Sequence, residues 1–349
     1  MFNSIQDFTL NLLPPTKRRS SSGWISFNAV CCHHRGETQD TRGRGGVHTD
    51  PDGGISYHCF NCNFTASYIP GRPIYYKFRK LLSWFGLAES EIQRLVIEAW
   101  RIKELIGPQE DIAAEKNDIV FEKRSIPKEA QSFLAWAEFY TLADRTFPKE
   151  FVDCVQYVYN RKINLKKYDF YWTPEVENKL SHRVVIPFIY GGETVGYTAR
   201  ALNSGIKPKY HSDHPPNYVF NLNNQLASNR FVIVCEGPFD AMSIDGVAVL
   251  SNDISETQAK LIESLDRPVI VVPDFDRHSN KSGREVWPGA QLIRRAIEYG
   301  WSVSFPVWRD TCKDINDAVV KYGKLFVVKS ILEARESSSL KIKVISKIL

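Results

Sequence analysis

The sequence predicts a multidomain protein in which a small metal-stapled β module precedes a larger α/β domain. Between residues 23 and 70, paired cysteines and histidines lie in a segment with few large aliphatic residues, and such a segment needs a staple to fold. From residue 231 onward, short apolar runs alternate with helical patterns, which is typical of βαβ units around a mostly parallel sheet. A chain of 349 residues can hold two or three domains with cores of their own.

The predicted boundaries follow changes in composition along the chain. In order, we expect the β module, a helical segment with a linker, a mixed region, the alternating region and a C-terminal tail: residues 1–73, 74–130, 131–230, 231–322 and 323–349. In the mixed region, apolar runs on both sides of Gly191 and Gly192 predict a β-hairpin. The first part of the helical segment is expected to end near Gly107-Pro108.

The overall composition indicates a globular protein in a reducing cytoplasm. Hydrophobic residues make up 43% and charged residues 24% of the chain, which is ordinary for a globular protein. No apolar run approaches the ~20 residues of a membrane helix, so no membrane partner is expected. The first residues, MFNSIQDFTLNLLPP, lack the basic start of a signal peptide. In a reducing compartment, the clustered members of the seven cysteines indicate a metal rather than disulfides.

The charge is unevenly distributed, although its net value is only +5. Residues 1–80 carry ten Lys or Arg against five Asp or Glu, whereas residues 231–320 carry nine against fourteen. This asymmetry indicates a polyanion-binding front and a cation-binding rear.

Two short clusters have the spacing of zinc knuckles, in which two ligands of one tight turn bind the same metal. Two residues separate the first predicted pair, and two separate the second; the predicted ligands are Cys31, His34, Cys59 and Cys62. Four protein ligands of this kind indicate a structural Zn²⁺ site. Adjacent residues remain alternatives as ligands: Cys32, His33 and His58.

Basic and aromatic residues are interleaved around these knuckles. They are Arg35, Arg42, Arg44, Phe60, Phe64 and Tyr68. Such a mixture favours single-stranded nucleic acid, whose bases stack on rings while its phosphates pair with guanidinium groups. The alternative for the rings is that they form the small core of the module.

Acidic residues follow apolar runs at three places in the rear of the chain. They are Glu236 with Asp240, Asp274 with Asp276, and Asp314 with Asp317. Because open α/β sheets bind ligands at the carboxyl ends of their strands, we expect these acids to converge in one crevice. Oxygen ligands without thiol or imidazole indicate Mg²⁺, with Mn²⁺ as the alternative ion. Taken singly, each could be ordinary turn chemistry.

Three segments resemble parts of one protein family. VIVCEGPFDAM, VVPDFD and KDINDAV resemble a Toprim domain, and CCHH with YHCFNC resembles the zinc ribbon of bacterial and phage DNA primases. RVVIPFIYGGETVGYTARAL with KPKYHS resembles the polymerase core that precedes Toprim in bacterial primases. The resemblance covers roughly residues 25–70 and 180–322, and its order and length are similar to those of the T-even bacteriophage type of primase.

The resemblance implies a role for individual residues. Glu236, Asp274 and Asp276 would be the catalytic metal-binding acids, with Asp240 and Asp314 in support. The residues that would line the template and nucleotide groove are Arg183, Arg200, Lys209 and Tyr210. The sequence departs from the family in two ways. The interval from His34 to Cys59 is longer, and Asn316 stands where bacterial relatives have an acid, which weakens the case for Asp317; the role of Lys313 stays open.

The activity implied is that of a DNA-directed RNA polymerase, a nucleotidyltransferase that makes short RNA primers on single-stranded DNA from ribonucleoside triphosphates. No phosphate-binding Gly-X-X-X-X-Gly-Lys-Ser/Thr loop is found, so a replicative helicase would be a separate partner in a primosome. A phage-encoded chain would act in the cytoplasm of its bacterial host. The alternatives are a Toprim-type nuclease and a non-enzymatic zinc-ribbon DNA-binding protein.

Overall fold

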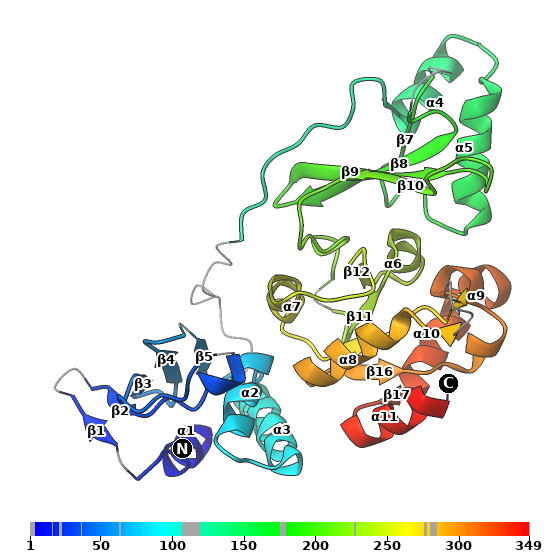
Figure 1. Ribbon diagram of the computed structural model, residues 1–349. Coiled ribbons are helices and arrows are strands. Elements are labelled where there is room, and N and C mark those ends of the chain that lie inside the picture. The colour runs from blue at the N-terminus through cyan, green and yellow to red at the C-terminus, as the bar shows by residue number, and fades with distance from the viewer. Residues whose placement is uncertain are drawn as a thin grey trace. The chain divides into compact units, whose positions relative to one another are not determined.

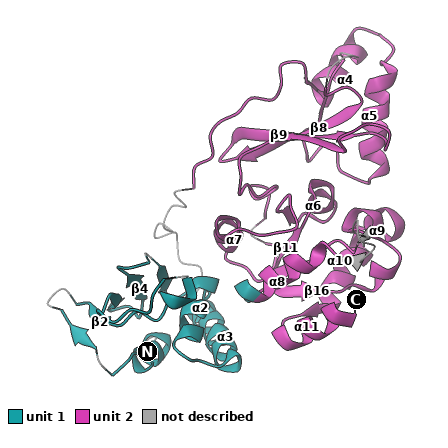
Figure 2. Cartoon of the chain, viewed as in Figure 1, with its two compact units in different colours: residues 1–116, 298–300 teal, residues 117–297, 301–349 magenta. Residues whose placement is uncertain are grey.

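The computed structural model (Figure 1) divides into two compact units, residues 1–116 with 298–300 and residues 117–297 with 301–349 (Figure 2). It describes the chain except at residues 1–3, 16, 21–22, 36, 63, 107–118, 175–178, 227, 276–277, 280–284 and 349. Of the helices in the described part, none has both the length and the apolar character that a bilayer crossing requires.

The first unit is built on an antiparallel sheet whose strands follow chain order. In β4 (Ile55–Cys59), Ile55, Tyr57 and Cys59 are buried while the residues between them are partly exposed, which is the alternation of a strand with one face on a core. The other elements are β1 (Arg18–Arg19), β2 (Ile25–Phe27), β3 (Gly45–Thr49), β5 (Thr65–Tyr68), α1 (Ser4–Asn11), the 3₁₀ turn η1 (His33–Arg35), α2 (Tyr76–Trp84) and α3 (Glu89–Ile106).

This unit extends past residue 73, where the sequence places the end of the module. Phe78 and Leu81 of α2 and Ile92 of α3 are buried in the same core as Tyr57 of the sheet. A small sheet with one apolar face needs a covering layer, and the two helices supply it. Residues 107–118, which include the first half of the predicted linker, lie outside the described residues.

The second unit begins with an antiparallel sheet in the order β10-β9-β8-β7-β6. Its centre is the predicted hairpin, which is confirmed: β8 (Arg183–Tyr190) pairs with β9 (Glu193–Ala201) across Gly191 and Gly192. Both glycines have positive φ, 58° and 82°, as a tight two-residue hairpin turn requires. The other elements are β6 (Gln131–Ser132), α4 (Phe133–Leu142), α5 (Lys149–Asn160), β7 (Tyr171–Trp172) and β10 (Tyr210–Asp213).

The rest of the unit is an α/β layer around a mixed sheet in the order β12-β11-β13-β16-β17. The first four strands are parallel and buried, as the alternating pattern predicted, and β17 joins the edge antiparallel. The elements are β11 (Val232–Cys235), α6 (Pro238–Ile244), β12 (Val247–Ala248), α7 (Glu256–Glu263), β13 (Val269–Val271), β14 (His278–Ser279), β15 (Glu285–Val286), α8 (Gly289–Tyr299), β16 (Ser302–Ser304), η2 (Val307–Asp310), α9 (Ile315–Tyr322), α10 (Lys324–Glu333), β17 (Arg335–Glu336) and α11 (Ser339–Ile348).

Two expectations for this region need correction. Residues 323–349 are not a tail, because Val327 and Ile331 of α10 are fully buried in the main core. Asp314 does not follow a strand end: β16 stops at Ser304, and Asp314 instead caps the N-terminus of α9. A carboxylate is a good helix cap since it accepts a bond from an otherwise unpaired N–H group.

The strand order creates a crevice beside β11. The chain leaves β11 to form β12 on one side and then returns to form β13 on the other side. At such a switch point the connecting loops part, and the carboxyl ends of the strands open onto a ligand-sized space. Glu236 follows β11 directly and Asp274 lies three residues after β13, so both reach this crevice.

Candidate functional site

Four cysteine sulfurs gather in the first unit. The Sγ atoms of Cys31, Cys32, Cys59 and Cys62 all lie within 4.8 Å of one another. The Sγ–Sγ distance is 3.4 Å between Cys31 and Cys62 and 3.5 Å between Cys32 and Cys59. Four thiolates at ~2.3 Å from a tetrahedral zinc ion would be about 3.8 Å apart, so both the donors and their spacing fit structural Zn²⁺.

The fourth member of this group is Cys32, where the sequence predicted His34. The turn η1 begins at residue 33, and it directs the His33 and His34 side chains outward while Cys31 and Cys32 stay buried. The ring of His34 instead stacks on Trp84, with centroids 5.1 Å apart and an interplanar angle of 6°. A four-cysteine set therefore replaces the predicted set of three cysteines and one histidine.

Polar neighbours orient the sulfurs. The Tyr57 hydroxyl lies 3.2 Å from the Sγ of Cys31, and the Asn61 amide donates to the Sγ of Cys32 at 3.4 Å. Burial raises the pKa of the thiols of Cys31 and Cys32. Without a cation these thiols would stay protonated, so the thiolates that zinc requires form together with metal binding.

The long loop between the knuckles is held by Asp40, whose side chain is fully buried. Its carboxylate accepts hydrogen bonds from the backbone of Ala29, Arg42 and Arg44 and from the Arg44 guanidinium. Burial alone would raise the pKa of Asp40, but these bonds outweigh it and lower that pKa to about 2. The added length of the loop is therefore an ordered structure around one carboxylate.

The aromatic residues near the knuckles divide into two kinds. Phe64 and Tyr68 are buried in the core, whereas Phe60 is 61% exposed. The Phe60 ring lies 4.2 Å from that of His58 and 6.2 Å from that of Trp24. Of the three predicted rings, only Phe60 is placed to meet a ligand.

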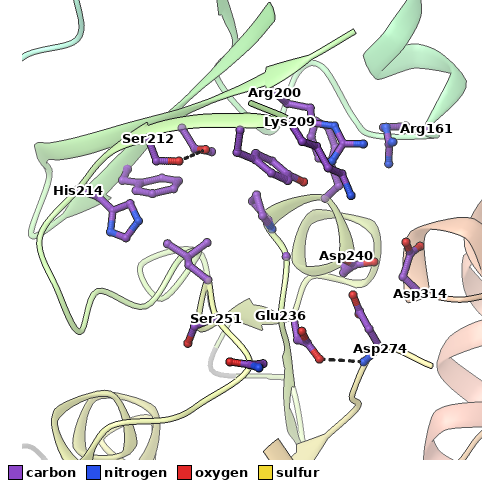
Figure 3. Close-up of a pocket in the computed structure, with 18 of the residues that line it drawn as sticks. Arg161, Arg200, Lys209, Ser212, His214, Glu236, Asp240, Ser251, Asp274 and Asp314 are labelled. Carbon is purple, nitrogen blue, oxygen red and sulfur yellow. Dashed lines mark hydrogen bonds between the residues drawn. The ribbon is translucent and has the colours of Figure 1, made fainter. Parts of the chain in front are cut away.

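The second unit contains a pocket of about 310 Å³ at the switch point of the mixed sheet (Figure 3). Predicted acids and predicted groove residues line it together: Glu236, Asp240, Asp274, Asp314, Arg200, Lys209 and Tyr210. Arg200 of β9 and Lys209, directly before β10, come from the antiparallel sheet region, and the acids come from the α/β layer.

The acids are fixed by backbone groups and crowd one another. Glu236 accepts a bond from the Asp274 N–H at 3.1 Å, and Asp240 accepts one from the Asn316 N–H at 2.9 Å. Burial raises the pKa of Glu236 to about 7 and, together with the charge of Asp314, that of Asp240 to about 7. Burial also raises the pKa of Asp314. Carboxylates in this state are destabilised unless a cation neutralises them.

This donor set fits a hard divalent cation such as Mg²⁺, because every donor is a carboxylate oxygen and backbone N–H groups orient those of Glu236, Asp240 and Asp314. The group is looser than the sulfur cluster. Among the described residues, only the four cysteines bring three or more such ligand atoms within 4.8 Å of one another. Asp276, a predicted ligand, lies outside the described residues.

The basic side of the pocket is prepared for an anion. The Arg200 guanidinium lies over the Tyr210 ring at 4.7 Å from its centroid, and the Arg200 Nε donates to the Tyr157 hydroxyl at 3.0 Å. Burial, followed by the charges of Arg200 and Lys313, lowers the pKa of Lys209. Burial raises the pKa of Tyr210 to about 12, so its hydroxyl stays neutral. An anionic ligand would relieve the repulsion among these cations.

Arg183, also predicted for the groove, is not among the residues that line the pocket. It is 3% exposed, and its guanidinium donates to the carbonyl oxygens of Lys179 and Ala199. Its position at the start of β8 turns the side chain into the sheet layer rather than the crevice, so we leave Arg183 out of the site.

Sequence reasoning missed a network behind the acids. Arg161 lines the pocket, and its guanidinium donates to the Asn316 side chain at 2.6 Å. The buried Asn316 amide donates in turn to the Arg161 carbonyl and to the Ser243 hydroxyl. Arg161 and Asn316 are 155 residues apart, so no local pattern could reveal their contact.

The structure also places Lys313 and Asp317, whose roles the sequence left undecided. Lys313 lines the pocket, with its Nζ 3.9 Å from carboxylate oxygens of both Asp314 and Asp317. The Asp317 side chain is 45% exposed and is not among the lining residues. At the position where an acid was expected, Asn316 thus provides a structural amide. Asp317 lies outside the pocket.

Comparisons with known proteins found neither a matching family model nor a matching curated protein. Among solved structures, the Escherichia coli primase catalytic core matches at 17% identity, with a TM-score of 0.41, over 54% of this chain and 74% of that one. The RNA polymerase domain of Mycobacterium tuberculosis primase matches at 18% identity and a TM-score of 0.43, over 59% and 82%. The Aquifex aeolicus primase, with zinc-binding and RNA polymerase domains, matches at 16% identity and a TM-score of 0.42, over 95% and 83%. All three of these solved structures are bacterial primases.

Proposed function

We propose that this chain is a DNA primase that makes short RNA primers on single-stranded DNA by Mg²⁺-dependent nucleotidyl transfer. One observation carries the proposal: acids from the α/β layer face Arg200 and Lys209 from the neighbouring sheet across a single pocket. Transfer of a nucleotide needs both, because carboxylates bind the metal that accompanies a triphosphate while basic groups bind its remaining charge. The Toprim and zinc-ribbon motifs in the sequence agree with it.

The residues of the pocket would have different roles in the reaction. Glu236, Asp274, Asp240 and Asp314 would hold Mg²⁺, together with Asp276, for which the sequence resemblance is the sole support. When bound, Mg²⁺ supplies charge neutralisation at the phosphoryl group. Arg200 and Lys209 bind and orient the triphosphate. Glu236 would also accept the proton of the attacking 3′-hydroxyl, at the carboxylate oxygen that does not bond to Asp274.

The first unit would serve as the template-binding module. Zn²⁺ on the four cysteines stabilises its small sheet, and the exposed Phe60 ring gives a base a surface to stack on. As parts of the same proposal, a separate replicative helicase is a partner, and the protein acts in the cytoplasm of a bacterial host.

Primer synthesis by a Glu236→Gln variant tests the proposal. The full chain is incubated with single-stranded DNA, Mg²⁺ and four ribonucleoside triphosphates, one of them labelled, and RNA products are separated by length. We expect the wild type to make short RNA and Glu236→Gln to lose on the order of 100-fold or more of the rate. Glu333→Gln, which changes an exposed acid that does not line the pocket, is the matched control and should keep full activity.

The same assay distinguishes the rival functions. A Toprim nuclease would shorten the DNA and incorporate no label, because the acids would then activate water instead of a 3′-hydroxyl. A non-enzymatic DNA-binding protein would give neither product, and its DNA affinity would be the same for wild type and Glu236→Gln. Either result contradicts a primase.

A further inference from the structure

The pocket has two chemically different ends, which follow from the register of β9 and β10. Tyr210 pairs with Arg200 and Ser212 pairs with Thr198. Side chains two residues apart point to the same face of a strand, about 7 Å apart, so a charged row is followed by a hydroxyl row. The Thr198 and Ser212 hydroxyl oxygens lie 2.6 Å apart. In Figure 3, Ser212 lies far from Asp314 and Arg161.

His214 forms the next row. It continues the alternation of Tyr210 and Ser212, and its ring lies at the end of the pocket opposite Asp314 (Figure 3). Gly196 is the residue of β9 that faces it: a Cβ there would lie 2.7 Å from the Cα of His214. The absence of a side chain at Gly196 therefore lets this segment pack closely on the sheet and fixes where the imidazole sits.

The hydrogen bond of His214 defines the chemistry of its outer nitrogen. Nδ1 lies 3.0 Å from the carbonyl oxygen of Pro215. Because a carbonyl oxygen only accepts, Nδ1 must carry the hydrogen, and in the neutral ring Nε2 then has a lone pair to accept a bond. The Phe188 ring packs against the His214 ring, with centroids 5.4 Å apart.

The described residues that line this end of the pocket are neutral. They are Ser212, with Thr198 bonded to it, and Phe188, whose ring packs on His214. Uncharged polar groups beside aromatic surface suit a heterocycle and a sugar, whereas the charged end suits phosphates.

We infer that the neutral end is the nucleoside subsite for the ribonucleoside triphosphate whose phosphates occupy the charged end, and that His214 contacts the nucleoside. The inference rests on the proposed function and deepens it. The order of rows matches the order of the ligand: phosphates at Arg200, ribose at the Thr198–Ser212 hydroxyls, and base at His214. The His214 Nε2 accepts a hydrogen bond from the nucleoside while the ring packs against it.

Two probes that share the charged end test this assignment. Binding of ATP and of inorganic tripolyphosphate, each with Mg²⁺, is measured on the full chain by calorimetry without DNA. We expect His214→Ala to weaken ATP binding roughly 5- to 10-fold, the effect of one hydrogen bond and its packing, and to leave tripolyphosphate binding unchanged. Arg200→Ala is the matched comparison and should weaken both. In primer synthesis, His214→Ala should raise the KM for nucleotide more than it lowers kcat.

Further variants keep the test decisive. His214→Gln retains an acceptor and should recover part of the ATP affinity, and Ser212→Ala should show a smaller selective loss if His214→Ala does not fold. Equal effects of His214→Ala on ATP and tripolyphosphate, or no effect on ATP, would overturn the inference, as would a loss confined to single-stranded DNA binding, which would make this end a template subsite. A wild type that binds neither probe and makes no RNA would instead sink the proposed function as well.

Discussion

The sulfur cluster and the acidic pocket are both candidate metal sites, but the chain builds them in different ways. The sulfurs come from two short segments, residues 31–32 and 59–62, of one small unit. They are close together, and all but that of the partly exposed Cys62 belong to buried residues. The acids are spread over the sequence between residues 236 and 314, on separate elements of a larger layer, and they line an open pocket. The first site holds a fold together, whereas the second leaves room for a substrate.

The two sites also differ in how they affect the stability of the fold. A close group of four thiols favours metal binding, and the free energy of binding becomes free energy of folding. The acids of the pocket have raised pKa values, so their ionised forms weaken the fold in the absence of a cation. Natural proteins accept such strain where a charged ligand has to bind.

Of the changes that separate the two sites, removal of zinc should have the largest effect on the stability of the protein. Structural zinc contributes ~10–16 kcal/mol in small modules, so a chelator should unfold the first unit and leave the second folded. Circular dichroism and limited proteolysis would detect this, with protected fragments confined to residues after about 116. A chain that keeps both units folded after its zinc is removed would contradict a structural role for the cluster.

Substitutions sharpen the ligand assignment. Cys32→Ser should lower zinc affinity by more than the roughly 100-fold that loss of a supporting residue costs, since it removes a ligand itself. His34→Ala is the matched control, because the His34 ring stacks on Trp84 outside the cluster, and it should retain one zinc per chain. Zinc content measured by atomic absorption decides between the four-cysteine set and the set with His34. Loss of zinc in His34→Ala but not in Cys32→Ser would show that His34 is the ligand.

In the acidic pocket, Asn316→Asp should destabilise the second unit by ~2–3 kcal/mol. The change removes the amide donor to the Arg161 carbonyl and the Ser243 hydroxyl, and it adds a buried charge near Asp240 that the Arg161 guanidinium offsets only in part. Chemical denaturation measures the free energy of unfolding. Asn203→Asp, at an exposed turn where the side chain only accepts, serves as control and should change it little. Equal stability of the two variants would remove Asn316 from the support of the pocket.

Substitution of Asp40, in the loop of the first unit, should have the smallest effect on stability, and the contribution of Asp40 should depend on pH. The pKa of Asp40 is lowered to about 2 from an ordinary 3.8, so the folded state favours the ionised form. This contributes about 2 kcal/mol above pH 3.8, and the contribution is lost as the pH falls through about 2. Asp40→Asn should therefore lower the stability of the zinc-loaded first unit at pH 7. A variant as stable as the wild type at pH 7 would show that Asp40 does not hold the loop.

The errors of sequence reasoning follow the same division between local and distant contacts. The hairpin at Gly191-Gly192 and the parallel strands were predictable because alternation and turn chemistry act over a few residues. The exchange of His34 for Cys32 was not, since the direction of η1 decides which of four adjacent side chains point inward. Likewise, residues 323–349 look like a tail until α10 packs its apolar face on the core.

By itself, the sequence determined which chemistries are present: paired cysteines in front, acids after apolar runs behind, and basic residues near a hairpin. These depend on residue type and short spacing. Only the tertiary structure decided that Arg183 faces carbonyl oxygens while Arg200 faces the acids, and that Asn316 joins Arg161 to Asp240. The reason is physical: whether a side chain meets a partner more than a hundred residues away depends on how the layers pack.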